Sequence, residues 1–308
     1  MPLDAYLLGW STTPGPPEVG AALALQLTEA GDGPARFRLG ALDGEWATFF
    51  ARRLTVHAAA DRAVQQAWRA YTATMDSTRV RAALDFEADS PSLKGDCRDV
   101  GRSILTTGGP DERQAVIDVL ADHLRTAHAE GRAAAAVLQS HGVTAPLREK
   151  APPVADDWTV EFDQAWDALA GNAASGSFLD DATGWMGRVV SGASGDLGQA
   201  MAGVIRDGGG YNDLLDAVDE LTGDDVDSAA VKFFTDLAVS QSLSNGALDL
   251  YSAEGITKID YMTAGDERVC EMCLNAEGGN PWDASEVPRP GLHGSCRCCI
   301  AASPPTLT

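Results

Sequence analysis

Five of the six cysteines lie close together near the C-terminal end of the chain. They are Cys270, Cys273, Cys296, Cys298 and Cys299. Thiolates are preferred ligands of Zn²⁺, and two cysteines separated by two residues can bind the same tetrahedral ion. The cluster therefore predicts a structural zinc site, in which the metal stabilises a tail with few large apolar side chains.

Five side chains compete for the four positions of a tetrahedral site: Cys270, Cys273, His293, Cys296 and Cys298. We expect the four cysteines of this set to bind the metal, with His293 either replacing one of them or hydrogen-bonding to a ligand. On an extended strand, Cys296 and Cys298 point to one face and Cys299 points to the other. Cys299 is therefore the expected non-ligand. Disulfide pairing or free thiols are the alternative. Disulfides require an oxidising compartment, and we expect none here because the first residues lack the basic, apolar pattern of a secretory leader.

A catalytic zinc site is the rival interpretation. Zinc-dependent deaminases combine a His-x-Glu motif with Pro-Cys-x-x-Cys, and this chain contains His128-Ala-Glu130 upstream of Cys270 and Cys273. However, Val269 stands where the proline is required, and the two halves are too far apart in sequence for one compact deaminase unit. His128 and Glu130 also fall on the polar face of an expected helix. We therefore expect no catalytic residues and no enzymatic activity.

The distribution of charge limits the partners. The chain of 308 residues has a net charge of −22. Residues 1–150 hold 16 basic and 19 acidic residues, whereas residues 151–308 hold 7 and 26, a net of −19. Such an acidic half is unsuited to duplex DNA, which binds through cations, and to an anionic membrane surface. We expect neither direct duplex DNA binding nor membrane association.

The elements that must position the cysteines are mainly helical. Apolar residues at helical spacing predict a helix from Glu45 and a second from Asp111 to about Gln139. A third helix is expected at 157–169, a fourth from Asp224 to about Ser252, and a strand at 256–261. The expected organisation is an extended Pro/Gly-rich arm at 1–40, a helical domain at 41–145, a linker at 146–155, a helical, Gly-rich domain at 156–254, and an α+β zinc-knuckle module at 255–308.

The segment 171–210 contains 11 glycines. Each glycine inside a helix costs about 0.5–1 kcal/mol relative to alanine. We therefore expect short helices here and a segment that is mobile or ordered by a partner. The triplet Gly208-Gly209-Gly210 predicts a loop rather than a phosphate-binding motif, because no Lys-Ser or Lys-Thr follows it.

The stretch 247–300 resembles the phage Mu F-like head morphogenesis family of minor capsid proteins. The resemblance rests on an ordered set of residues: Gly255-Ile256, Tyr261, Asp266, Cys270, Cys273, His293 and Cys296-Arg297-Cys298. Three positions depart from the family pattern. Tyr261 stands for the usual tryptophan, Gly294 replaces a proline after the histidine, and Ser240-Gln241 stands where a Thr-Glu pair is usual.

This resemblance implies a low-copy virion protein of a tailed bacteriophage, located in the head interior or at the portal vertex and present in the host cytoplasm during assembly. The implied partners are the portal protein and the major capsid protein, and the implied role lies in DNA packaging or ejection. A cytosolic zinc-binding adaptor is the alternative from another class, and a zinc-dependent enzyme comes third.

Overall fold

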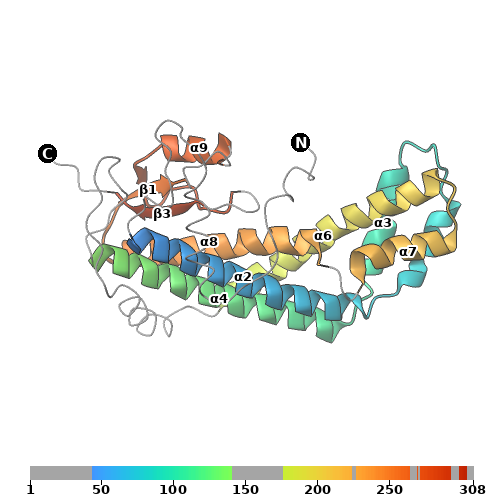
Figure 1. Ribbon diagram of the computed structural model, residues 1–308, viewed down its shortest axis with the longest axis horizontal. Helices are drawn as coiled ribbons and strands as arrows, with labels where there is room; N and C mark the ends of the chain where they lie inside the picture. The colour runs from blue at the N-terminus through green and yellow to red at the C-terminus, as the bar shows by residue number, and fades with distance from the viewer. Residues whose placement is uncertain are drawn as a thin grey trace.

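The computed structural model describes residues 44–140, 176–223, 227–263, 269, 271–292 and 298–303. Long helices form the body, and a small three-stranded antiparallel sheet lies near the C-terminal end (Figure 1). The predicted mainly α class is therefore confirmed, including the small C-terminal α+β unit. The expected arm at 1–40, the linker at 146–155 and the helix at 157–169 lie outside the described residues.

Three long helices lie side by side along the body: α2 (Gly44–Thr72), α4 (Pro110–Ser140) and α8 (Ala229–Ala253). These helices confirm three of the four helices expected from the sequence, those that begin near Glu45, Asp111 and Asp224. The side chain of Ser228 caps α8 by accepting a hydrogen bond from the backbone N–H of Val231, and Gly255 follows the helix at φ +74°. This left-handed conformation favours glycine and turns the chain out of the helix.

The closest helix contact is between α4 and α8, and it depends on two glycines. A Cβ on Gly131 would lie 1.8 Å from the carbonyl oxygen of Leu243, and a Cβ on Gly246 would lie 1.9 Å from that of His128. Both distances are far below van der Waals contact. Glycine at both positions therefore lets the two helix backbones touch.

The contact between α2 and α8 contains a row of polar side chains, here called the polar seam. On α2 they recur every fourth residue, which places them on one helix face. The pairs across the seam are Arg53 with Ser240, His57 with Asp236 and Ser240, Asp61 with Lys232, Gln65 with the backbone of Ser228, and Arg69 with Asp227. The helices α2 and α8 run in opposite directions (Figure 1). Because each polar side chain of α2 pairs with a specific residue of α8 or its N-terminal flank, the polar seam fixes one register between the two helices.

The glycine-rich segment contradicts the expectation of short helices. It forms one helix, α6 (Gly176–Arg206), of 31 residues. Buried apolar side chains recur along it at three- and four-residue spacing: Phe178, Ala182, Trp185, Met186, Val189, Ala193, Leu197 and Met201. Burial of this stripe offsets the intrinsic cost of the glycines, and Gly198 lets the backbone of Arg98 approach within 2.6 Å of where a Cβ would stand. The triplet at 208–210 follows the helix as a loop, as predicted.

The end of the body away from the sheet consists of η4 (Ser77–Asp85), α3 (Leu93–Leu105) and α7 (Tyr211–Thr222), packed around the C-terminal half of α6 (Figure 1). The sequence patterns did not predict these three elements. One continuous apolar core joins them to α2, α4 and α8. The described parts of segments 41–145 and 156–254 therefore pack as one body.

The C-terminal unit, here called the module, contains β1 (Lys258–Met262), α9 (Glu271–Gly278), β2 (Trp282–Asp283) and β3 (Cys299–Ala302). The strand order is β2-β1-β3, with Ile259 opposite both Trp282 and Ala302. The predicted strand at 256–261 is confirmed as β1. A second apolar cluster lies under the sheet and includes Leu250 and Tyr251 of α8, so the module is packed onto the helical body.

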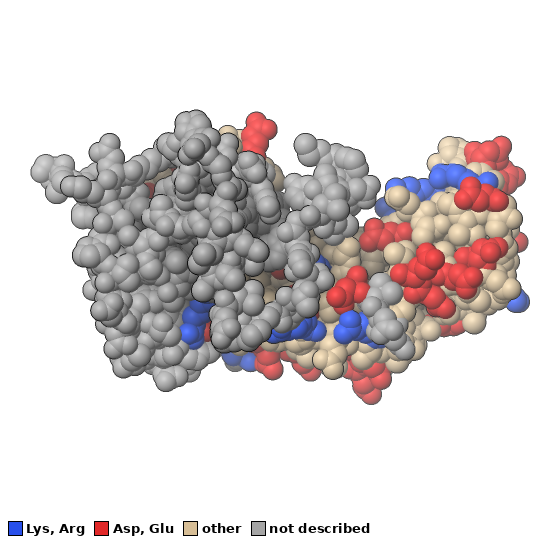
Figure 2. Space-filling model, viewed as in Figure 1, with Lys and Arg blue, Asp and Glu red and all other residues tan. Residues whose placement is uncertain are grey.

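Acidic side chains gather on the end of the body opposite the module (Figure 2). On α7 the exposed acids are Asp213, Asp216, Asp219 and Glu220. No helix among the described residues is apolar enough over sufficient length to cross a bilayer.

Candidate metal centre in the C-terminal module

Cys273 is the candidate ligand whose surroundings are most completely described. It lies in the first turn of α9, is fully buried, and belongs to the apolar cluster of the module. The hydroxyl of Tyr261 lies 3.4 Å from its sulfur and donates a hydrogen bond to it. Cysteine sulfur is a preferred ligand of zinc in structural sites. This environment fits a structural zinc ligand.

Hydrogen bonds from α9 and the residues after it to β1, β2 and the residue after β1 hold Cys273 in place. The side-chain oxygen of Asn280 accepts from the backbone N–H of Tyr261 at 2.7 Å, and its amide donates to the carbonyl of Tyr261 at 2.8 Å. The carboxylate of Glu277 accepts from the hydroxyl and the backbone N–H of Thr263. The indole N–H of Trp282 donates to the carbonyl of Ala276 at 2.7 Å. Together these bonds fix α9 and the residues after it against the sheet whose central strand, β1, carries Tyr261.

Cys298 and Cys299 occupy different surroundings at the start of β3. Cys298 is buried in the same apolar cluster as Cys273. Cys299 is also buried, but it lies among side chains of the helical body, including Arg53 of α2, Leu138 of α4 and Tyr251 of α8. Burial raises the pKa of Tyr251, and the neighbouring Cys299 raises it further. The structure thus places Cys273 and Cys298 in one apolar cluster and Cys299 against the helices, and the exclusion of Cys299 from the metal site stays a prediction.

Cys270, His293 and Cys296 lie outside the described residues, so the full ligand set stays a prediction. Within the described ranges there is no group of three or more His, Cys, Asp or Glu side chains arranged for a metal. Only two of the five candidates, Cys273 and Cys298, fall in those ranges. The four-thiolate site and the alternative with His293 both remain open.

The deaminase-like pair is buried between helices. His128 and Glu130 do not lie on a solvated polar face, as expected from the sequence, because both are buried in α4. The ring Nε2 of His128 lies 2.8 Å from a carboxylate oxygen of Asp249, and Arg52 donates two hydrogen bonds to the carboxylate of Glu130. Each side chain therefore pairs with another helix.

Part of the polar seam has the connectivity of a hydrolytic triad. Ser240 Oγ lies 3.3 Å from His57 Nε2, and His57 Nδ1 lies 3.3 Å from Asp236 Oδ1. The Ser240 hydroxyl also accepts a hydrogen bond from Arg53, and Ser240 is only 1% exposed. A nucleophile must reach its substrate, whereas the Ser240 hydroxyl is buried between α2 and α8. Burial lowers the pKa of His57, although its hydrogen bond to Asp236 opposes this effect.

The spacing of the polar residues in the polar seam can be seen in the sequence, but only the apolar residues of these helices were considered in the sequence analysis. Arg53 and His57 are four residues apart, as are Asp236 and Ser240. Polar residues at this spacing lie on one face of each helix.

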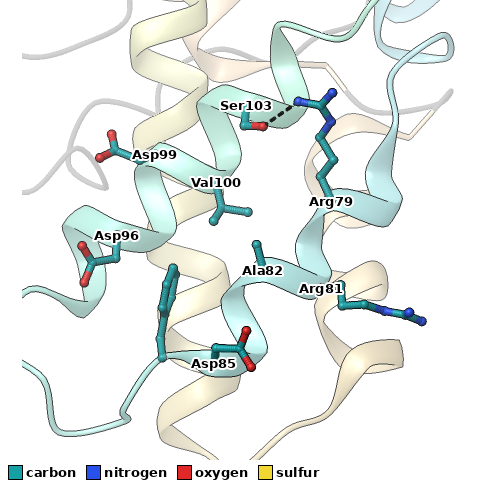
Figure 3. A pocket seen from close by; sticks show the side chains of 9 residues that line it. Arg79, Arg81, Ala82, Asp85, Asp96, Asp99, Val100 and Ser103 are labelled. Atoms are coloured by element: carbon teal, nitrogen blue, oxygen red, sulfur yellow. Dashed lines mark hydrogen bonds between the residues drawn. The ribbon is translucent and has the colours of Figure 1, made fainter.

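A second candidate site is an open hollow of about 630 Å³ between η4 and α3 (Figure 3). Ala82, Phe86 and Val100 contribute apolar surface. The charged residues around it are Arg79, Arg81, Asp85, Asp96 and Asp99. Arg79 is hydrogen-bonded to Ser103 at 2.9 Å, and Arg81 lies over the ring of Tyr211. Both cations are thus engaged within the protein, and no set of groups converges on a ligand.

Comparison of this chain with protein-family models, with curated proteins and with solved structures gave no match.

Proposed function

We propose that this chain is a minor capsid protein of a tailed bacteriophage head, with a structural zinc site in its C-terminal module. The observation that carries this proposal is the ordered set of residues from Gly255 to Cys298, which resembles the Mu F-like head morphogenesis family. The structure is compatible with the set, because a helix leads through Gly255 into a strand bearing Tyr261.

The zinc site joins parts of the module that are distant in sequence. Cys273 follows β1 and Cys298 immediately precedes β3. A metal ion bound by Cys273 and Cys298, together with Cys270 and Cys296, would link the chain after β1 to the chain before β3. Structural zinc sites of this kind contribute directly to folding free energy. Cys270→Ser is therefore expected to reduce zinc content and loosen the module.

The partners in this proposal are the portal protein and the major capsid protein. The net charge of −19 for residues 151–308 disfavours contact with phosphate groups, and α7 presents four exposed acids at one end of the body. A role in packaging or ejection would therefore act through proteins rather than through direct binding of duplex DNA. We propose no catalytic activity.

Mass spectrometry of purified particles tests the proposal. A minor capsid protein is recovered with heads at a low number of copies relative to the major capsid protein. A cytosolic zinc-binding adaptor, the second candidate, would bind zinc equally well but would be absent from particles. Particles that lack the protein would therefore contradict the proposed function and favour the adaptor.

A further inference from the structure

The hollow between η4 and α3 presents apolar surface on a preformed frame. Residues three apart lie on one face of a 3₁₀ helix, so Ala82 and Asp85 of η4 face the hollow together. Beside them, Phe86 is half-buried, and Val100 of α3 is buried. Both η4 and α3 contribute side chains to the continuous apolar core of the body. The shape of the hollow therefore does not depend on a partner.

Three carboxylates surround this apolar surface, those of Asp85, Asp96 and Asp99. Asp96 and Asp99 project from the same side of α3 (Figure 3). Asp96 accepts a hydrogen bond from the hydroxyl of Ser92 at 2.7 Å. Asp85 and Asp99 are exposed, and neither has a hydrogen bond or an ion pair in the part of the chain that the structure describes. Their charge is therefore available to a partner.

The two arginines of the hollow are engaged elsewhere. Arg79 donates a hydrogen bond to Ser103 at 2.9 Å and pairs with Asp76 at 3.7 Å. The guanidinium of Arg81 lies 5.0 Å from the centroid of the Tyr211 ring, where cation and ring attract each other, and it points away from α3 (Figure 3). Within the described ranges, no cation is thus ion-paired with the carboxylates of the hollow.

The neighbouring helix α7 makes this end of the body more negative. It packs against η4 and contains no Lys, Arg or His. Its exposed acids belong to the acidic surface visible in Figure 2. Complementary charge steers a partner toward a surface and disfavours partners of like charge. A basic partner surface therefore fits this end of the molecule.

We propose that the hollow between η4 and α3 is a docking site for a Lys or Arg side chain of a partner protein. The aliphatic stem of that side chain lies on Ala82, Phe86 and Val100, and its charged end pairs with Asp85 or Asp99. The ring of Phe86 adds attraction for the cation. An apolar centre with a polar rim is typical of protein–protein contacts, and this site does not depend on the proposed function.

Nuclear magnetic resonance titration of the full, isotope-labelled chain with short peptides tests this chemistry. The probe is Leu-Arg-Leu with blocked ends, and Leu-Gln-Leu and Leu-Glu-Leu are the neutral and acidic peptides of matched size. The arginine peptide should cause saturable shifts of backbone amides in η4 and α3. Asp85→Asn and Asp99→Asn should each weaken its binding by about two- to fivefold, as for exposed ion pairs. Asp181→Asn is the matched control, because it removes one exposed carboxylate from the first half of α6, away from the hollow.

Binding that is weakened by Asp85→Asn and Asp99→Asn but not by Asp181→Asn supports the docking site. Equal binding of the glutamine peptide would show that the hollow selects apolar groups alone, and stronger binding of the glutamate peptide would show that Arg79 and Arg81 dominate it. Either result overturns the proposal. Shifts spread equally over α7 and the hollow, equal weakening by the control variant, or no shift in η4 and α3 would overturn it as well.

Discussion

Replacing the glycines at the crossing of α4 and α8 tests the packing of the helical body most severely. In Gly131→Ala, the new methyl group would overlap the backbone carbonyl of Leu243 at 1.8 Å, and in Gly246→Ala it would overlap that of His128 at 1.9 Å. A carbonyl oxygen within a helix cannot rotate aside as a flexible side chain can. The two helices must therefore move apart along their most extensive contact.

The size of the effect follows from two opposing contributions. Overpacking of a close-packed core costs about 1–3 kcal/mol and sometimes more, and a clash with backbone should reach the upper end of that range. Alanine regains about 1 kcal/mol of helix propensity relative to glycine. Each variant should therefore be less stable by roughly 2 kcal/mol or more. The double variant should lose less than the sum, because one separation of the helices relieves both overlaps.

Urea unfolding followed by far-ultraviolet circular dichroism measures these differences. Gly187→Ala in α6 is the matched control, since no atom lies within 4 Å of its added Cβ. It should raise stability by about 0.5–1 kcal/mol through helix propensity alone. If Gly131→Ala and Gly246→Ala also raise stability, the two backbones do not touch at this crossing and the account of the body is wrong.

Four further predictions can be measured on the purified protein. Gly198→Ala should lower the free energy of unfolding by about 1–3 kcal/mol, because its methyl group meets the backbone of Arg98 at 2.6 Å; a variant as stable as wild type would contradict that contact. Burial lowers the pKa of His57 below its unfolded value of 6.5, so the unfolded state binds more protons at acidic pH. The free energy of unfolding should therefore fall as pH drops below about 7, by at most about 1.4 kcal/mol per pH unit. His57→Gln should reduce this pH dependence, and an unchanged pH dependence would refute the lowered pKa of His57. Metal analysis should find about one zinc per chain, reduced in Cys270→Ser and Cys298→Ser but not in Cys299→Ser; equal zinc loss in all three would reject the ligand set. Gel-shift assays at physiological salt should show no binding of duplex DNA, whereas tight, salt-sensitive binding would overturn the inference from charge.

Apolar periodicity was sufficient to predict the long helices of the body and the first strand of the module. It failed where glycine content was given more weight than periodicity. In α6 the buried stripe from Phe178 to Met201 is regular, and the glycines lie between its members. Gly198 occupies a close backbone contact, whereas Gly187 contacts no other element. Glycine content alone could not distinguish a glycine required by a close backbone contact from one that contacts no other element.

The burial of polar side chains and the close approach of loops depend on tertiary contacts, which local sequence patterns do not predict. The sequence assigned His128 and Glu130 to a solvated face because their partners, Asp249 and Arg52, belong to other helices. The contact of Gly291 with α8 was likewise hidden, because it joins residues about fifty positions apart. By contrast, the cysteines are clustered along the chain itself, so the candidate site could be predicted although its ligand geometry could not.

We propose that this protein is a structural component of phage heads. The most direct test of this proposal is quantitative mass spectrometry of purified particles after heads and tails have been separated. The account predicts the protein in the head fraction, at a copy number comparable to that of the portal protein and far below that of the major capsid protein. Absence from particles, or recovery with tails alone, would contradict it.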